Sequence, residues 1–282
     1  MLSKKTLAVF LISTGVFLLG VSLIGEITTL GSYESGEPNS GEQFDESLVD
    51  SIRSVDELIA FSLEISGDSQ ILNSEQKMIL LYESVIDRFT HSSGARHTIV
   101  TNWILFFAGK FVYPLGFIWD QEIFLSKGHS LICSQSSYLL MQAALRCGII
   151  ARHVGLYGHV VMEAWYDDDW HMFDPDSEVL VKNSVGTVLS VDEISRDMPL
   201  LREVYVGRQK KLISIFASRE DNSFASYPVG TYFEWKSQVL LYFEKVMQVL
   251  KYLIPICFTL SGTLMLLKFS DTLEGDLSSP AK

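Results

Sequence analysis

Three residues in the middle of the chain could together perform nucleophilic catalysis: Cys133, His159 and Asp174. A cysteine attacks a carbonyl carbon as its thiolate, and a neighbouring imidazole must take or share the thiol proton. A carboxylate beside the imidazole fixes its orientation and stabilises the imidazolium. Each residue alone fits a structural role, because free cysteines usually pack as small hydrophobic residues. The prediction of a Cys–His–Asp site therefore depends on the three occurring as a set.

The position of Cys133 is chemically favourable, because a helix is predicted to begin there. Residues 134–147 repeat apolar side chains at helical spacing, and Gly148 is a natural helix stop. The N-terminus of a helix carries partial positive charge, which stabilises a thiolate. Its backbone N–H groups can also hold a developing oxyanion.

The segment after this helix changes to the alternating pattern of strands, predicted at 149–157, 159–166 and 170–173. His159 opens the second strand, and Asp174 follows the third after a turn at 167–169. Adjacent antiparallel strands would bring Asp174 back beside His159, although Asp176 is an alternative for the same role. A helix followed by an antiparallel meander predicts an α+β domain.

These residues also match a known pattern: a Cys opening a helix, a Gly-Ile-x-Ala-Arg segment, a His-x-Trp-x-Glu segment, then a Trp and Asp-Pro. The matching positions are Cys133, Gly148, Ile149, Ala151, Arg152, Trp170, Asp174 and Pro175, and the His-x-Trp-x-Glu segment is matched loosely by His159, Glu163 and Trp165. The chain thus resembles the transglutaminase-like superfamily over about residues 125–178, and less closely over 73–215. The resemblance implies a papain-like fold in a membrane-anchored, bacterial-type member. It also implies Cys133 as nucleophile, His159 as base, Asp174 as orienting residue and no cofactor.

The chain departs from this pattern in the loop before His159, which is short, and in Val161, where the family often has an aromatic residue. The partner that would complete an oxyanion hole is not identified by the sequence, and four residues are candidates: Asn102, Trp103, Trp119 and His129. Arg152 and Glu163 are expected to pair across strands, and Trp165 and Trp170 to pack on the sheet.

A metal site is the main alternative chemistry. Its candidate ligands are Cys133, His129, His153, His159 and His171. Their spacing matches no closed zinc pattern, so no metal is expected. The remaining cysteines, Cys147 and Cys257, do not form a disulfide framework with Cys133.

Both ends of the chain carry long apolar segments. Residues 6–25 contain no charged side chain, and residues 246–267 contain only Lys251, which could extend to lipid headgroups, and Pro255, which would kink a helix. A signal peptide is the alternative for the first segment, although its apolar run is long for one. Lys4 and Lys5 precede that segment, so the positive-inside rule predicts both termini in the cytoplasm and the domain between them outside.

The predicted organisation has six parts. They are an anchor (1–25), a linker with a short helix (26–72), the transglutaminase-like domain (73–220), a connecting helix (221–245), a second span (246–268) and a cytoplasmic tail (269–282). Within them, Asn73 and Gln76 resemble a capping box, and Ser190 with Glu193 suggests another helix start. A helix is expected at 97–110, an irregular segment at 113–128, and a strand at 212–217.

The chain of 282 residues has a formal net charge of -12 and no basic stripe, which argues against nucleic-acid binding. The partners expected instead are the lipid bilayer and a peptide or protein of the cell envelope. The expected activity is that of a cysteine hydrolase or acyltransferase, which cleaves a peptide or carboxamide bond through a thioester. The alternative is an inactive binding or scaffold module of an envelope assembly.

Overall fold

The computed structural model describes residues 3–27, 38–64, 72–91, 94–156, 158–205, 210–217 and 232–277. These residues form two compact units. The helical unit comprises residues 1–32, 97–116 and 242–282, and the α+β unit comprises residues 33–96 and 117–241. The predicted linker, connecting helix and tail lie partly outside the described residues.

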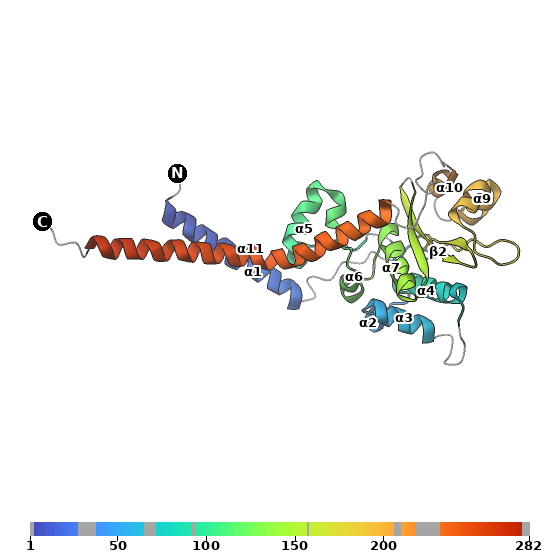
Figure 1. The fold of residues 1–282 in the computed structure, drawn as a ribbon, viewed down its shortest axis with the longest axis horizontal. Helices are drawn as coiled ribbons and strands as arrows, with labels where there is room; N and C mark the ends of the chain where they lie inside the picture. The colour runs from blue at the N-terminus through green and yellow to red at the C-terminus, as the bar shows by residue number, and fades with distance from the viewer. Residues whose placement is uncertain are drawn as a thin grey trace. The chain divides into compact units, whose positions relative to one another are not determined.

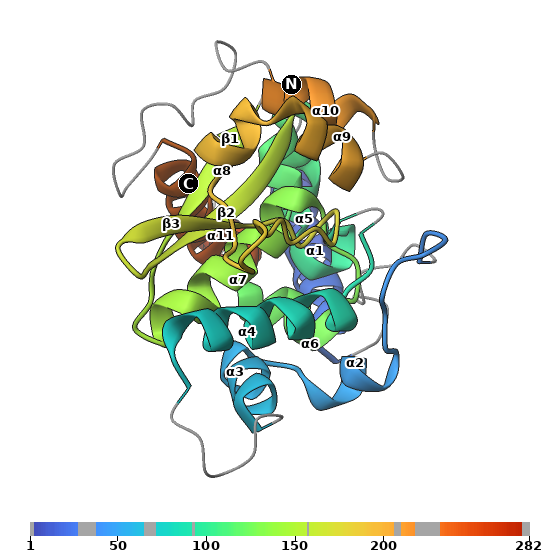
Figure 2. The ribbon, with the colours of Figure 1, turned by 90° about the vertical axis from the view of Figure 1, so that its right-hand side faces the viewer.

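The α+β unit is built around a three-stranded antiparallel sheet with the order β1-β2-β3 (Figure 2). Its strands are β1 (Ile150–Leu156), β2 (His159–Tyr166) and β3 (Asp169–Phe173). Asp167 and Asp168 both have positive φ, which is the geometry of a tight hairpin turn. The expected meander is therefore present, and the chain is α+β as predicted.

Helices cover both faces of this sheet. The helices that lie wholly in the α+β unit are α2 (Ser47–Ser51), α3 (Val55–Glu64), α4 (Ser74–Arg88), α6 (Gln121–Lys127), α7 (Cys133–Arg146), α8 (Val191–Arg196), α9 (Met198–Tyr205) and α10 (Lys210–Ala217). One hydrophobic cluster joins α3, α4 and α7 to Met162 and Ala164 of β2. A second cluster joins α8, α9 and α10 to Val161 of the same strand. The alternation of side chains along β2 thus supplies two cores, one on each face.

Several local predictions are confirmed. Capping boxes begin α4 at Asn73 and α8 at Ser190. Arg152 lies opposite Glu163 in the sheet, and the rings of Trp165 and Trp170 make an edge contact.

Two predictions are corrected. Residues 212–217 belong to helix α10 and not to a strand, because Leu212, Ile215 and Phe216 recur at helical spacing and are buried together. The segment predicted to be irregular contains a 3-10 turn, η2 (Tyr113–Gly116), and helix α6, which Asp120 caps through its side chain.

The helical unit contains α1 (Lys4–Ile27), α5 (Ile99–Phe111), η2 and most of α11 (Tyr232–Leu277). The helix predicted at 97–110 therefore exists as α5, but it belongs to this unit and not to the α+β unit. Two helical segments, Lys4–Ile27 and Ser237–Lys268, are long and apolar enough to cross a membrane. Figure 1 draws them in blue and in orange to red.

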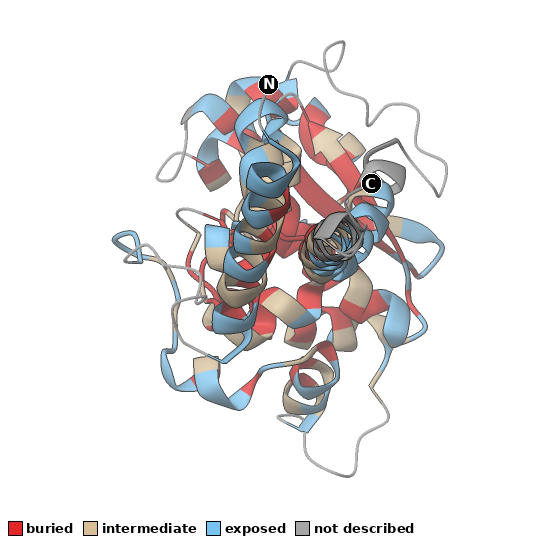
Figure 3. Cartoon of the chain, turned by 90° about the vertical axis from the view of Figure 1, so that its left-hand side faces the viewer, coloured by how far each residue is buried: buried red, intermediate tan, exposed pale blue. Residues whose placement is uncertain are grey.

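Helices α1 and α11 pack antiparallel through small residues. A Cβ added to Gly262 would lie 2.7 Å from the Ala8 carbonyl, and one added to Gly15 would lie 2.6 Å from the Pro255 carbonyl. Ala8, Gly15 and Ser22 repeat every seven residues and are buried, whereas most of α1 is exposed (Figure 3). Small residues that allow close backbone approach are typical of helix pairs in membranes. Pro255 is accommodated inside one continuous helix.

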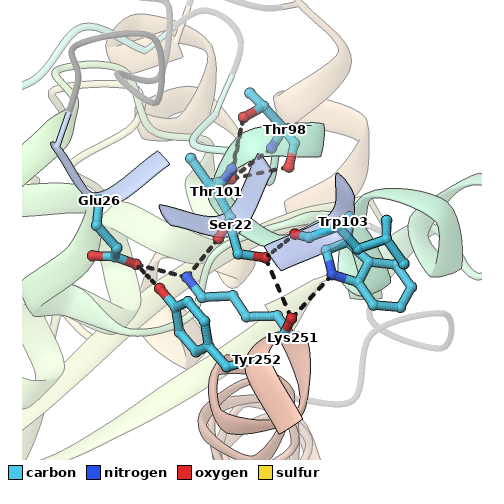
Figure 4. Close-up of polar contacts among 8 residues, drawn as sticks. Ser22, Glu26, Thr98, Thr101, Trp103, Lys251 and Tyr252 are labelled. Carbon is cyan, nitrogen blue, oxygen red and sulfur yellow. Dashed lines mark hydrogen bonds and ion pairs between the residues drawn. The ribbon is translucent and has the colours of Figure 1, made fainter. Parts of the chain in front are cut away.

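A polar cluster closes one end of this helix pair (Figure 4). The Lys251 ammonium donates to the Glu26 carboxylate (2.7 Å) and to the Thr101 carbonyl (2.9 Å). The Lys251 carbonyl accepts from Ser22 and from the indole N–H of Trp103, both at 3.3 Å. Lys251 is only 3% exposed, and the Glu26 carboxylate neutralises its charge within the unit. The side chain therefore does not adopt the extended position toward lipid headgroups that the sequence suggested.

Candidate active site

Cys133 is the first residue of α7, and the preceding segment is fixed by buried hydrogen bonds. The Gln135 amide donates to the carbonyls of Ala95 (2.9 Å) and Ile118 (2.7 Å), and its oxygen accepts from the Ala95 N–H at 3.0 Å. Leu131 donates its N–H to the Thr90 carbonyl (2.9 Å). The thiol is half-buried. These bonds set the position of the helix start, and with it the position of the sulfur.

His159 is held near that helix start by its strand. The Ser137 hydroxyl of α7 donates to the Val160 carbonyl (3.1 Å), which ties the first turns of the helix to the beginning of β2. In the β2–β3 register Met162 lies opposite Phe173. The same register, continued past the end of β3, would set Asp176 opposite His159 and Asp174 diagonal to it. Diagonal neighbours on one sheet face are within reach of long side chains.

Asp174 orients the imidazole directly. One carboxylate oxygen (Oδ2) lies 2.9 Å from His159 Nε2 and accepts a hydrogen bond from the Tyr205 hydroxyl at 3.0 Å. The other oxygen accepts from the Ser177 N–H at 3.1 Å. Asp174 is fully buried, and His159 is 4% exposed. A buried carboxylate that is hydrogen-bonded in this way is a fixed acceptor, so Nε2 must carry a proton.

The contact with Asp174 at Nε2 leaves Nδ1 for the thiol. The Cys133 sulfur, a His159 ring nitrogen and an Asp176 carboxylate oxygen all lie within 4.8 Å of one another. Asp176 Oδ2 lies 4.0 Å from Nδ1. The structure therefore brings together all three residues predicted from the sequence. It gives the orienting position to Asp174 and places Asp176 on the opposite side of the ring.

The electrostatics favour a charged imidazole. Burial alone would lower the pKa of His159, but the Asp174 carboxylate and the Cys133 thiol raise the pKa well above its ordinary value. Burial opposes ionisation of Asp174 too, yet His159, Ser177 and Tyr205 together lower its pKa. A proton shared between the thiol and an imidazole of high basicity tends to reside on the imidazole, which leaves a thiolate.

Asp176 has the opposite character. Burial raises its pKa to about 7, and the charges of Asp174 and Glu42 add to this effect. A neutral carboxyl at Asp176 would not compete for the His159 proton, whereas its ionised form would attract it.

The four candidate oxyanion partners make contacts of their own. Asn102 and Trp103 belong to the helical unit, where the Asn102 side chain accepts from the Leu105 N–H. Trp119 packs on Tyr138, and His129 stacks on Phe44. None of these contacts points to an oxyanion donor.

Most of the candidate metal-ligating residues do not come together in the structure. Burial lowers the pKa of His153 to about 3, and its ring packs on Tyr138. Both ring nitrogens of His171 contact backbone carbonyls, those of Val188 and Tyr166. Of the predicted ligand set only Cys133 and His159 come together, and the residue that joins them is Asp176.

Two residues that support the site were not predicted from the sequence. Tyr205 lies 31 positions after Asp174, so no local pattern connects the two. Gln135 lies close to Cys133 in the chain, but its partners Ala95 and Ile118 are distant in sequence. As predicted, Arg152 pairs with Glu163: two of its guanidinium nitrogens, Nε (2.9 Å) and Nη2 (2.6 Å), contact one carboxylate oxygen.

A cavity of about 300 Å³ lies next to this ion pair, between Trp170 and the start of α8. Its lining contains none of Cys133, His159 and Asp174.

Comparison with known proteins adds no relationship: no protein-family model, no curated protein and no solved structure matches this chain.

Proposed function

We propose that this protein is a membrane-anchored cysteine enzyme of transglutaminase-like type, which cleaves a peptide or carboxamide bond through a thioester. The observation that carries the proposal is the chain of contacts from Asp174 through His159 to Cys133 at the start of a helix. A buried carboxylate, a buried imidazole of raised pKa and a half-exposed thiol form a complete set for nucleophilic catalysis.

The reaction follows from these groups. The Cys133 thiolate attacks the carbonyl carbon, a C–S bond forms, and the carbonyl electrons move to oxygen. The N–H groups of Cys133 and Ser134 precede the first helical hydrogen bond of α7, which the Gln135 N–H donates to the Ile132 carbonyl, so they are suited to bind that oxyanion. His159 then gives its Nδ1 proton to the leaving amine as the C–N bond breaks, which yields a thioester.

The second half reverses these roles. Water or an amine attacks the thioester, and His159 takes its proton. The C–S bond breaks, and the thiolate returns. Asp174 holds the ring in place and stabilises the imidazolium in both halves, without itself taking a proton.

The proposed fold and location rest on coarser observations. The helix carrying the cysteine packs on an antiparallel sheet whose strands carry the His and lead to the Asp, which supports a papain-like core. The antiparallel packing of α1 against α11 supports a two-span topology with both termini on one side. Lys4 and Lys5 favour the cytoplasm for that side. A peptide or protein of the cell envelope is then the natural substrate.

The test is acylation of the full-length protein in detergent with an activated ester, followed by peptide mapping. An acyl group is expected on Cys133 that hydroxylamine removes, as it does from thioesters, and the His159→Gln variant should acylate far more slowly. Cys147 is the matched control, because burial raises the pKa of its thiol. Equal acylation of Cys133 and Cys147 in the native protein would refute the proposal and leave the binding-module alternative.

One observation favours a second candidate, a metal-dependent hydrolase. Cys133, His159 and Asp176 present a sulfur, a nitrogen and an oxygen within 4.8 Å of one another. Three protein ligands and one open position are typical of catalytic zinc, and Asp174 would then support the ligating His from behind. Ligand atoms around tetrahedral zinc are about 3.3–3.8 Å apart, given bond lengths of about 2.0–2.3 Å. The three side chains would therefore have to move closer together.

Asp176→Asn separates the two candidates, because Asp176 belongs to the metal set alone. The cysteine mechanism predicts that the variant still acylates at Cys133 and that activity survives a chelator. The metal mechanism predicts stoichiometric zinc in the purified protein, and loss of both zinc and activity in the variant.

A further inference from the structure

We propose that α5 and η2 form a hairpin that inserts into one leaflet of the bilayer beside α1 and α11, as a third membrane element that does not span. This inference concerns residues 97–116, called here the α5–η2 hairpin, and it rests on the proposed membrane embedding of the two long helices. The ligand is the apolar interior and headgroup layer of a lipid bilayer.

The hairpin belongs to the helical unit by its contacts. A Cβ added to Gly25 of α1 would lie 2.6 Å from the Val100 carbonyl carbon, so the two backbones touch. From α11, Lys251 donates to the Thr101 carbonyl and accepts from the Trp103 indole (Figure 4). His97 Nε2 lies 3.1 Å from a carboxylate oxygen of Glu244, and both side chains are buried. The first part of the hairpin is therefore packed against both candidate spans.

The hairpin is closed by a close backbone approach. A Cβ added to Gly109 would lie 2.7 Å from the Gly116 nitrogen, so this crossing needs glycine. The His97 N–H donates to the Gly116 carbonyl (2.9 Å), which joins the two ends of the hairpin. The turn between them is thus held as a rigid projection.

The part of the hairpin from Phe107 to Tyr113 carries exposed apolar side chains. Phe107, Phe111, Val112 and Tyr113 are 50%, 88%, 51% and 63% exposed. Exposed aromatic residues of this size are costly in water when they gather on one short element, and such patches mark interaction sites. Lys110 is the one charged side chain within the α5–η2 segments, and it lies 4.8 Å from the Phe106 ring.

A bilayer fits this surface better than a protein partner does. The exposed aromatic residues belong to the same unit as α1, where Phe10 and Phe17 are 62% and 66% exposed. Tyr and a basic residue beside Phe side chains are typical of the membrane–water interface. With 13 residues, α5 is about 20 Å long, too short for a hydrocarbon core of about 30 Å. The hairpin therefore inserts from one side and does not cross.

Photocrosslinking tests this directly. The full-length protein would carry p-benzoylphenylalanine at Phe111, at Phe107, at Phe10 of α1, or at Val185, and would be illuminated in nanodiscs of zwitterionic and anionic phospholipid. Val185 is the matched control, because it is 83% exposed but belongs to the α+β unit. Lipid adducts should form at Phe111 and Phe107 with yields comparable to that at Phe10, and should fall to background at Val185.

The outcomes are distinct. Adducts at Phe10 without adducts at Phe111 and Phe107 would overturn the hairpin proposal and leave the spans intact. Absence of adducts at all three positions would overturn the embedding as well. Neither result bears on Cys133, whose acylation is measured separately in detergent.

Discussion

Asp174→Asn should remove the charge that makes His159 a strong base while leaving the shape of the site almost unchanged. In the native protein the Asp174 carboxylate accepts from His159, Tyr205 and Ser177, and it is the largest influence that raises the pKa of His159. Without that charge, burial of the ring becomes the dominant effect. Burial disfavours the imidazolium, so the pKa of His159 should fall and the thiol proton should stay on sulfur.

The magnitude can be worked from the contact itself. A hydrogen bond to a charged group contributes about 1.5–3 kcal/mol, which corresponds to about a 10- to 100-fold change in a protonation equilibrium, and its loss should lower the pKa of His159. Because the thiolate depends on that proton transfer, alkylation of Cys133 near pH 6 should slow by about 10- to 100-fold. At high pH, where hydroxide takes over from the imidazole as the base, the rates of the two proteins should converge.

The assay is the rate of iodoacetamide alkylation of Cys133 between pH 5 and pH 10, followed by mass spectrometry, with Cys147 in the same sample as internal reference. Thermal unfolding of the variant checks that it folds. Equal Cys133 rates at pH 6 in the native protein and in Asp174→Asn would refute the assigned role of Asp174. A uniform loss at all pH values would point to distortion of the site, not to loss of charge.

Three further predictions concern stability and helix packing. The folded-state pKa of Asp176 is raised from 3.8 to about 7, so the folded protein binds the extra proton and loses stability as the pH rises through this range. Asp176→Asn should therefore raise the free energy of unfolding, and with it the melting temperature, more at pH 8 than at pH 4. The upper limit of this gain is about 4 kcal/mol, and an equal change at both pH values would contradict the prediction. Glu163→Gln removes the carboxylate that Nε and Nη2 of the buried Arg152 contact, and it should lower the free energy of unfolding in denaturant titrations by about 3–5 kcal/mol. A change below about 1 kcal/mol would contradict the assigned pairing. Gly15→Val should separate α1 from α11, because the new side chain would meet the Pro255 carbonyl. Fluorescence transfer between labels on the two helices should then fall. The same substitution at Gly20, where there is open space, should have little effect on the transfer.

Much of the α+β unit could be predicted from local sequence. Helix α7 and the three strands were found within one or two residues, because side-chain periodicity and turn chemistry act over short distances. The capping boxes at Asn73 and Ser190 were read correctly for the same reason.

The failures have physical causes as well. The six residues 212–217 are too short for periodicity alone to separate helix from strand, and packing of α10 against α9 and the sheet decided the outcome. The apolar helix at 97–110 was predicted, but its place in the helical unit was not. Its partners α1 and α11 come from the two ends of the chain. A long-range contact of this kind leaves no local signal.

The same division holds for the site. The sequence by itself determined the three residue types, their order, and their places at a helix start, a strand start and a strand end. Only the tertiary structure decided between Asp174 and Asp176, because that choice depends on which carboxylate reaches Nε2 and on the hydrogen bonds from Tyr205 and Ser177. It also gave the imidazole its high pKa, since burial and the charge of a fixed carboxylate exist only in the folded chain.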